Sequence, residues 1–501
     1  MTEQAEHVRG STLLVAGRLV ALLFTIATQV VLVRSLTRSE YGAFAFALAL
    51  TSSSALLLSL GQGRSLSRFL AIYEERREYG RLFGSLVIAI GTIAATTAVL
   101  IVTVGVWGDV ILGGVSEQPH ARTVLTILIV LAPLEALDDV VVTIFAVFSR
   151  PRSIFFRKYL LTPGLRFTVV LLLVLFGQDV VFLAVGYVAT GLIGLAVYAF
   201  LLARVLRERD LVQHLHVRRI SLPFRAVWTF SGAMLTTELV FLSMNTGSVM
   251  LLAAFHGAED VAGYRAVFPP ARMNQFVYTG FLLLFLPLVS RLFARGDRAA
   301  MRDVYWQNAA VLAVLSFPVL AMTVPFAEAT TVTLFGERYA DAAVVLAVLS
   351  IGYYANAALG FNAATLQVVG RLRYVVTVNV SAALLNLALG LLLIPRFGVL
   401  GVAVSNGATL VVQNLANQWG LRSSLSTSLI DRRYVPVYAM IVLGAGALVG
   451  VQVIFSPGFI VCVVLSVCTS AALLLAARRW LRLAALFPEL QHVPVLRHFV
   501  A

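Results

Sequence analysis

The sequence predicts an all-α integral membrane protein with about fourteen transmembrane helices. Of its 501 residues, 60% are hydrophobic and 12% are charged, and the mean hydropathy is +0.92. A soluble domain is nearer half apolar and one quarter charged. Apolar runs of about 18 residues or more, each able to cross a hydrocarbon core of about 30 Å, recur from one end of the chain to the other. Runs of this length indicate helices, because the strands of a membrane barrel are about ten residues of alternating polarity.

The predicted spans share this length and low polarity. They cover residues 10–33, 42–62, 83–107, 122–148, 159–177, 180–203, 227–255, 265–290, 305–326, 342–366, 375–394, 400–420, 436–455 and 458–477. We expect the first span to be a retained helix, because the polar start MTEQAEHVRGS lacks the basic region of a signal peptide.

Lysine and arginine predict the orientation, because cytoplasmic loops carry an excess of both. With the N-terminus inside, the inside loops hold 28 of these residues besides Arg9, the outside loops hold six, and three lie within spans. This bias predicts a multi-pass protein of the cell membrane with both termini in the cytoplasm. It also accounts for the net charge of +14, so no nucleic-acid partner is expected.

The longest predicted cytoplasmic connection, residues 204–225, follows the sixth span and divides the chain. The expected parts are an N-terminal bundle over 1–203, a linker over 204–226, a C-terminal bundle over 227–420, and two further helices with a cytoplasmic tail over 421–501. A short internal repeat agrees with this division, since SEYGAFAF (39–46) follows the first span and DVAGYRAVF (260–268) follows the seventh. Repeats of this kind are common in transporters, whose substrates bind near the interface between the repeats.

Two longer stretches carry a family pattern. The first is LVRSLTRSEYGAFAFALALTSSSALLLSLGQGRSLSRFLA (32–71), and the second is residues 334–407, which include LFGERYADAA, LQVVGR and LIPRFGVLGVA in that order. The glycines and the proline of these motifs also suit a purely structural role in turns. Taken together, the stretches resemble the polysaccharide-transport (Wzx-type) flippases, in the superfamily that includes MATE exporters and MurJ-type lipid II flippases.

This resemblance implies two six-helix bundles around a V-shaped, alternately opening cavity, with two helices added at the C-terminus. It implies a flippase that moves a polyprenyl-(pyro)phosphate-linked oligosaccharide from the inner to the outer leaflet, for the assembly of cell-surface polysaccharide or glycan. The partners it implies are this lipid-linked substrate, membrane lipids, and the enzymes that polymerise or ligate the glycan.

Three arginines are candidates for binding the anionic head group of such a substrate. An ionisable group at membrane depth costs roughly 2.5–3.5 kcal/mol on insertion scales, so it is a functional candidate by default. Arg18 lies about 12 Å into the first span, where its side chain could also snorkel to the cytoplasmic interface. Related flippases carry cavity arginines on the first and eighth helices, and Arg18, Arg272 and Arg265 occupy comparable places here. The second span holds no further arginine, so the cluster of the relatives is incomplete.

Three acids of the fourth span are candidates for coupling transport to an ion. Glu135, Asp138 and Asp139 can share one helix face, because positions three and four apart are neighbours. They could form a proton site, a cation site, or ion pairs with Arg18 or Arg166. Structural pairing across the first bundle would explain them equally well.

Glu238 in the seventh span and Asn379 in the eleventh are two further coupling candidates. Some relatives bind sodium between these helices through oxygen ligands, which suit a hard cation. Ala383 stands where an acid should accompany Asn379, so hydrogen bonding between helices is the competing role for that asparagine.

Two other functions remain open on the sequence: a MATE-type cation-coupled exporter of small molecules, and a membrane enzyme that polymerises or ligates glycans. An enzyme would need catalytic groups at the outer face, and the longest outside loop (108–121) offers no informative spacing. No Walker A pattern is present, and Cys462 and Cys468 are six residues apart, too far along a helix for a disulfide. We therefore expect a transporter without a cofactor, with Na⁺ or H⁺ as the candidate coupling ion.

Overall fold

The computed structural model describes residues 3–112, 120–148, 151–208, 213, 220–242, 246–425, 428 and 430–481. Over these residues the protein is helical throughout, with no β-strand, which confirms the predicted all-α class. Ten of the described helices are long and apolar enough to cross a membrane, or eleven when one bent pair is counted as a single span. One of the ten is 54 residues long and contains two of the predicted spans.

The contacts within the chain form two compact units, residues Met1–Ala262 (unit 1) and Gly263–Ala501 (unit 2). The domain boundaries expected from the sequence stay a prediction. Each unit is described below by itself.

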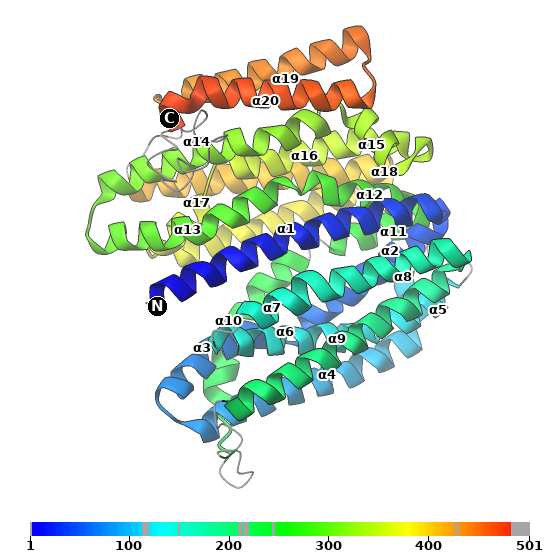
Figure 1. Ribbon diagram of the computed structural model, residues 1–501, viewed down its shortest axis with the longest axis vertical. Helices are drawn as coiled ribbons and strands as arrows, with labels where there is room; N and C mark the ends of the chain where they lie inside the picture. The colour runs from blue at the N-terminus through cyan, green and yellow to red at the C-terminus, as the bar shows by residue number, and fades with distance from the viewer. Residues whose placement is uncertain are drawn as a thin grey trace. The chain divides into compact units, whose positions relative to one another are not determined.

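Unit 1 consists of long helices that run back and forth (Figure 1). Its helices are α1 (Glu3–Ser35), α2 (Arg38–Leu58), α3 (Gln62–Glu75), α4 (Tyr79–Leu112), α5 (Ala121–Leu128), α6 (Leu131–Val147), α7 (Pro151–Ile154), the π-helix η2 (Phe155–Leu161), α8 (Thr162–Phe176), α9 (Val180–Glu208), α10 (Phe224–Leu242) and α11 (Ser248–His256). Helix α12 (Ala258–Ala271) crosses the boundary between the units.

Helix α2 begins at a capping box. The Thr37 hydroxyl accepts from the Glu40 backbone N–H at 3.2 Å, and the Glu40 carboxylate accepts from the Thr37 N–H at 2.9 Å. These two bonds satisfy backbone donors that the first turn of a helix otherwise leaves unpaired. A Cβ on Gly42 would overlap the backbone carbonyl of Ala258, so the glycine of the SEYGAF motif permits close packing of α2 against the start of α12.

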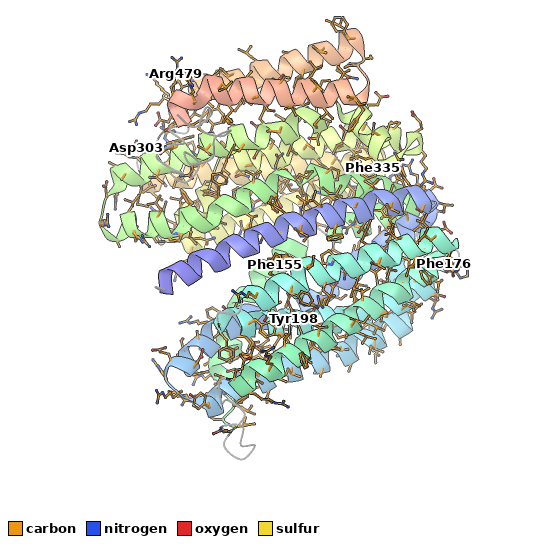
Figure 2. All side chains as sticks on the ribbon, in the orientation of Figure 1. Phe155, Phe176, Tyr198, Asp303, Phe335 and Arg479 are labelled. Atoms are coloured by element: carbon orange, nitrogen blue, oxygen red, sulfur yellow. The ribbon has the colours of Figure 1, made fainter. Side chains whose placement is uncertain are left out.

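Helix α6 lies in the core of unit 1, packed against α2, α3 and α9. Its buried apolar side chains include Ala136, Val140 and Phe145, and the Phe145 ring meets the Tyr198 ring of α9 edge-on at 5.3 Å between centroids. Tyr198 is fully buried among the helices (Figure 2). Helix α1 packs against α8 and against the π-helical segment η2.

Unit 2 has α14 at its centre, packed against α13, α16, α19 and α20. Its helices are α13 (Asn274–Ala294), α14 (Arg298–Thr323), α15 (Ala327–Phe335), the 3₁₀-helix η6 (Glu337–Ala342), α16 (Ala343–Ala358), α17 (Asn362–Val368), α18 (Leu372–Leu425), α19 (Val435–Phe455) and α20 (Phe459–Leu481). Cys462 and Cys468 on α20 are free thiols, as the sequence predicts.

Helix α18 is broken at Gly398, within the LIPRFGVLGVA motif. Gly398 has φ 52° and ψ −126°, a conformation that side chains with a Cβ rarely adopt. Three residues later, a Cβ on Gly401 would lie 2.6 Å from the carbonyl oxygen of Leu393. The motif therefore makes the tight turn that joins the two predicted spans of this helix.

Candidate functional site

Unit 1 contains a cavity of about 510 Å³ between α1, α2, α6, η2, α8 and α9. Its wall combines apolar side chains with hydroxyls, carboxylates and cations. The lining residues are Ala21, Thr25, Thr28, Gln29, Leu48, Glu135, Asp138, Asp139, Val142, Arg157, Lys158, Tyr159, Thr162, Pro163, Arg166, Tyr187 and Tyr198.

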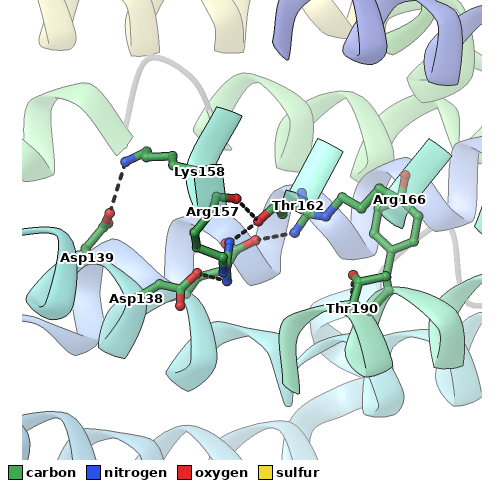
Figure 3. A network of polar contacts seen from close by, with 9 residues as sticks. Asp138, Asp139, Arg157, Lys158, Thr162, Arg166 and Thr190 are labelled. Carbon is green, nitrogen blue, oxygen red and sulfur yellow. Dashed lines mark hydrogen bonds and ion pairs between the residues drawn. The ribbon is translucent and has the colours of Figure 1, made fainter. Parts of the chain in front are cut away.

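The three acids predicted on one face of α6 each meet a different cation (Figure 3). Glu135 Oε1 lies 3.0 Å from Arg166 Nη2, and Asp139 Oδ1 lies 3.5 Å from Lys158 Nζ. Asp138 accepts a hydrogen bond from Arg157. We call these three ion pairs the charge ladder. Of the partners that the sequence left open for the acids, Arg166 is the one that the structure brings to them.

Arg157 is the most enclosed member of the charge ladder, with 3% of its side chain exposed. It also donates to the Thr162 hydroxyl, and its guanidinium carbon lies 4.8 Å from the centroid of the Tyr198 ring. A Cβ on Gly194 of α9 would overlap this guanidinium, so the glycine leaves the space that Arg157 fills. A buried charge requires such partners, because desolvation alone would cost several kcal/mol.

The other two pairs are more open to solvent. Arg166 and Glu135 are 27% and 26% exposed, and the Arg166 guanidinium lies 5.0 Å from the Tyr187 ring. Lys158 and Asp139 are 45% and 65% exposed. The charge ladder therefore grades from a buried pair to an exposed one. Guanidinium groups bind carboxylate and phosphate oxygens through the same planar set of donors, so Arg157 and Arg166 present donors of a kind that also bind phosphate.

Arg18 lies on α1 next to the cavity wall. Its Nε donates to the hydroxyl of Tyr159 at 3.3 Å, and Tyr159 itself lines the cavity. The cavity lining also includes Thr25, Thr28 and Gln29 of the same helix. The side chain is therefore directed toward the π-helical segment.

Arg265 and Arg272 lie together in unit 2, at α12 and the turn that follows it. Their guanidinium carbons are 5.7 Å and 5.0 Å from the centroid of the Phe268 ring. Arg272 also donates to Gln275 Oε1 at 3.1 Å and lies 6.0 Å from the Tyr353 ring. The two arginines thus share one aromatic partner.

The remaining coupling candidates have different surroundings. Asn379 Oδ1 accepts from Gln413 Nε2 at 2.9 Å. About two turns further along α18, Asn386 donates to Asn406 Oδ1 at 2.8 Å. Glu238 belongs to α10, but its side chain lies outside the described residues. Among the residues that the structure describes, no three His, Cys, Asp or Glu side chains are grouped closely enough to hold a metal ion.

Sequence reasoning missed Arg157 and Lys158, which it assigned to a cytoplasmic loop before the fifth span. The structure instead continues the helix back to Pro151 and makes Phe155–Leu161 π-helical. Single π-helical turns occur frequently at functional sites. The signal available in the sequence was Pro151, which suits the first turn of a helix and marks an earlier start than the apolar run.

The sequence and the fold match known membrane proteins. The model of the family "Polysaccharide biosynthesis protein" matches residues 7–293. An uncharacterized membrane protein of Methanocaldococcus jannaschii is 26% identical over 207 residues, so the match spans 40% of this chain and 40% of that protein.

Two groups of solved structures share the fold at low sequence identity. The lipid II flippase MurJ in an inward closed conformation superposes with a TM-score of 0.71 and 11% identity, over 96% of this chain and 99% of that one. An inward-facing multidrug resistance MATE family transporter of the MOP superfamily superposes with a TM-score of 0.65 and 14% identity, over 81% and 94%. The predicted MATE-like architecture is thereby confirmed. The chain is a multi-pass membrane protein with the fold of MOP-superfamily transporters, and it belongs to the polysaccharide biosynthesis protein family.

Proposed function

We propose that the protein is a flippase that moves a polyprenyl-(pyro)phosphate-linked oligosaccharide from the cytoplasmic to the outer leaflet by alternating access. Its membrane is the cell membrane, both termini lie in the cytoplasm, and its glycan product passes to polymerising or ligating enzymes. Family membership and the MurJ-like fold support a role in carrying a lipid-linked glycan precursor.

The observation that carries the proposal is the charge ladder in the cavity of unit 1. A pyrophosphate needs cations that are already positioned, and it must displace whatever anion they hold. Arg166 is partly exposed and paired with Glu135 at 3.0 Å, so it can change partner without being moved into the cavity. Arg18, Arg265 and Arg272 are the further arginines that we assign to the head group or to sugar hydroxyls.

The coupling ion is part of this proposal. A carboxylate released from its arginine by the substrate gains affinity for a proton or for Na⁺, because it has lost its counter-charge. On this basis Glu135, Asp138 and Asp139 are our first candidates for coupling, and Glu238 and Asn379 are the alternatives. We propose no resident cofactor.

A MATE-type exporter of small cations is the second candidate, since the fold is shared and three carboxylates line the cavity. Each of those carboxylates is occupied by a basic side chain. A cationic substrate would therefore meet a surface whose negative charges are already neutralised, and this favours the flippase.

The test uses a host that lacks its own oligosaccharide flippase and depends on this protein for glycan export. The variants are Arg18→Gln, Arg166→Gln and Arg272→Gln, and the readout is lipid-linked oligosaccharide labelled from the outer face. Loss of a charge-assisted hydrogen bond to the head group should lower export by about tenfold or more. Arg207→Gln, an exposed arginine at the end of α9, is the matched control and should export normally.

Membrane abundance of each variant is measured in parallel, so that loss of protein is not read as loss of transport. Export at the wild-type level in all three variants would contradict the assignment of these arginines. Efflux of a cationic dye by cells that export no glycan would favour the second candidate.

A further inference from the structure

A second hollow of unit 1 lies away from the charge ladder, between α3 and α10. It has a volume of about 600 Å³ and is wide open to the surroundings. The residues that line it, which we call the α3–α10 groove, are Arg68, Phe69, Arg225, Ala226, Thr229 and Phe230. Two arginines and two phenylalanines thus share a small surface.

The rings hold one arginine in place. The guanidinium carbon of Arg68 lies 4.9 Å from the centroid of Phe230 and 5.8 Å from that of Phe69. The two rings meet edge-to-face, with centroids 6.0 Å apart. A guanidinium stacked on rings keeps its N–H donors in its own plane, so they stay available to an anion.

The walls of the groove are fixed to each other. Leu66 and Leu70 on the opposite face of α3 are each 1% exposed and belong to the core of unit 1. The Ser65 hydroxyl donates to the carbonyl of Val227 on α10 at 3.3 Å. At Gly61, the residue before α3, a Cβ would lie 2.7 Å from the Ser231 carbonyl oxygen. These contacts hold α3 and α10, and therefore the backbones of Arg68 and Arg225, in a fixed relative position.

Both arginines of the groove face outward, and neither forms an ion pair in the part of the chain that the structure describes. Next to Arg225, the side chains of Leu222 and Phe224 are 54% and 59% exposed. The Phe224 ring lies 5.8 Å from that of Trp228. Exposed aliphatic and aromatic side chains beside unpaired cations are typical of a surface at the boundary between hydrocarbon and lipid head groups.

We propose that the α3–α10 groove binds the phosphate head group of an anionic phospholipid, with Arg68 and Arg225 on the phosphate and the acyl chains against Leu222 and Phe224. Clusters of arginine and lysine on the cytoplasmic side of a membrane protein attract anionic lipid head groups. The predicted orientation places the connection between the second and third spans, which includes α3, on that side. The groove and the cavity that contains the charge ladder share no lining residue, so this proposal does not rest on the proposed substrate.

The experiment measures lipid binding to the purified full-length protein by native mass spectrometry. Delipidated protein is titrated with phosphatidylglycerol and, separately, with phosphatidylcholine. The proposal expects tighter binding of phosphatidylglycerol, and a loss of about tenfold or more in the Arg68→Gln/Arg225→Gln variant, since each arginine near a lipid surface contributes a severalfold factor. The matched control, Arg207→Gln/Arg371→Gln, removes two exposed arginines outside the groove and should bind as the wild type does.

Two further arms separate the sources of phosphate and guard against misfolding. Leu222→Ala/Phe224→Ala should weaken binding of long-chain phosphatidylglycerol and leave the short-chain dihexanoyl lipid unaffected. Arg68→Lys/Arg225→Lys, which keeps the charge but loses the planar donors stacked on the rings, should bind more tightly than the glutamine variant and less tightly than the wild type. Equal binding of the two lipids, an equal loss in the control, or full displacement of the lipid by millimolar inorganic phosphate would overturn the proposal.

Discussion

Arg157 of the π-helical segment donates to Asp138 of α6 while only 3% of the arginine side chain is exposed. The pair joins two helices of unit 1 at a depth where neither charge is fully solvated. Removing one partner of a buried ion pair typically costs about 3–5 kcal/mol, because the other charge is left without compensation. The consequences of this arrangement can be measured.

Arg157→Gln should lower the free energy of unfolding in detergent micelles by about 3–5 kcal/mol, since Asp138 loses its counter-charge. Asp138→Asn should do the same, and the double variant should recover part of the loss. Lys158→Gln is the control, because its pair with Asp139 is largely exposed and should contribute no more than about 1 kcal/mol. Equal losses in Arg157→Gln and Lys158→Gln would show that the buried pair of Arg157 and Asp138 contributes no more to stability than the exposed pair does.

Gly194→Ala tests the space that Arg157 occupies. The added Cβ would overlap the guanidinium and should destabilise the protein by about 1–3 kcal/mol, as overpacking does. Gly446→Ala on α19 is the control, because a Cβ there meets nothing within 4 Å and alanine is the better helix former. Thermal unfolding of the two variants should therefore shift in opposite directions, and a parallel shift would contradict the close contact at Gly194.

Gly398→Ala tests the break in α18. At φ 52° and ψ −126° an alanine is strained, so a loss of about 1–3 kcal/mol is expected. Gly401→Ala should also be destabilising, because its Cβ would press on the Leu393 carbonyl. If Gly398→Ala unfolds at the wild-type temperature, the turn can be made in another backbone conformation.

A relay of amides in unit 2 gives a fourth test. Asn386 donates to Asn406, and Asn406 donates to the hydroxyl of Tyr264 at 3.0 Å. Single side-chain hydrogen bonds between membrane helices contribute about 0.6 kcal/mol on average and up to about 1.7. Asn406→Ala should cost more than Tyr264→Phe, and the double variant should lose less than the sum of the two. Strict additivity in this double-mutant cycle would mean that the two groups are not coupled.

The sequence was sufficient for the helical class because run length and composition decide it locally. It also placed Glu135, Asp138 and Asp139 on one face, since helical spacing does not depend on tertiary contacts. It did not identify Arg157 or Lys158 as cavity residues. The fifth span was predicted from its apolar run, and the charged residues just before that run were assigned to a loop. The π-helical segment that brings these cations to α6 packs against α1 and α9, and such contacts between distant parts of the chain are not encoded in a local pattern.

The surroundings of the candidate arginines, and of the arginines in the α3–α10 groove, could not be predicted from the sequence either. Membrane depth and the resemblance to the flippases made Arg18, Arg265 and Arg272 candidates. The partners that orient them are Tyr159 for Arg18 and Phe268 for the other two, and these are set by tertiary packing. The α3–α10 groove was not foreseen for a similar reason, since its two arginines are more than 150 residues apart in the chain.

The π-helical segment Phe155–Leu161 has a consequence for the angular phase of the helix that contains it. Arg157 and Arg166 are nine residues apart, two and a half turns of a regular α-helix, so ideal winding would point them in opposite directions. Both nevertheless reach carboxylates of α6. The wider winding of the segment reduces the rotation between them. Deleting one of the residues between Arg157 and Arg166 would change the rotation between the two side chains, because each residue of a helix adds a rotation about the helix axis. The number of residues in this stretch, and not only their identities, therefore determines which acid each cation meets.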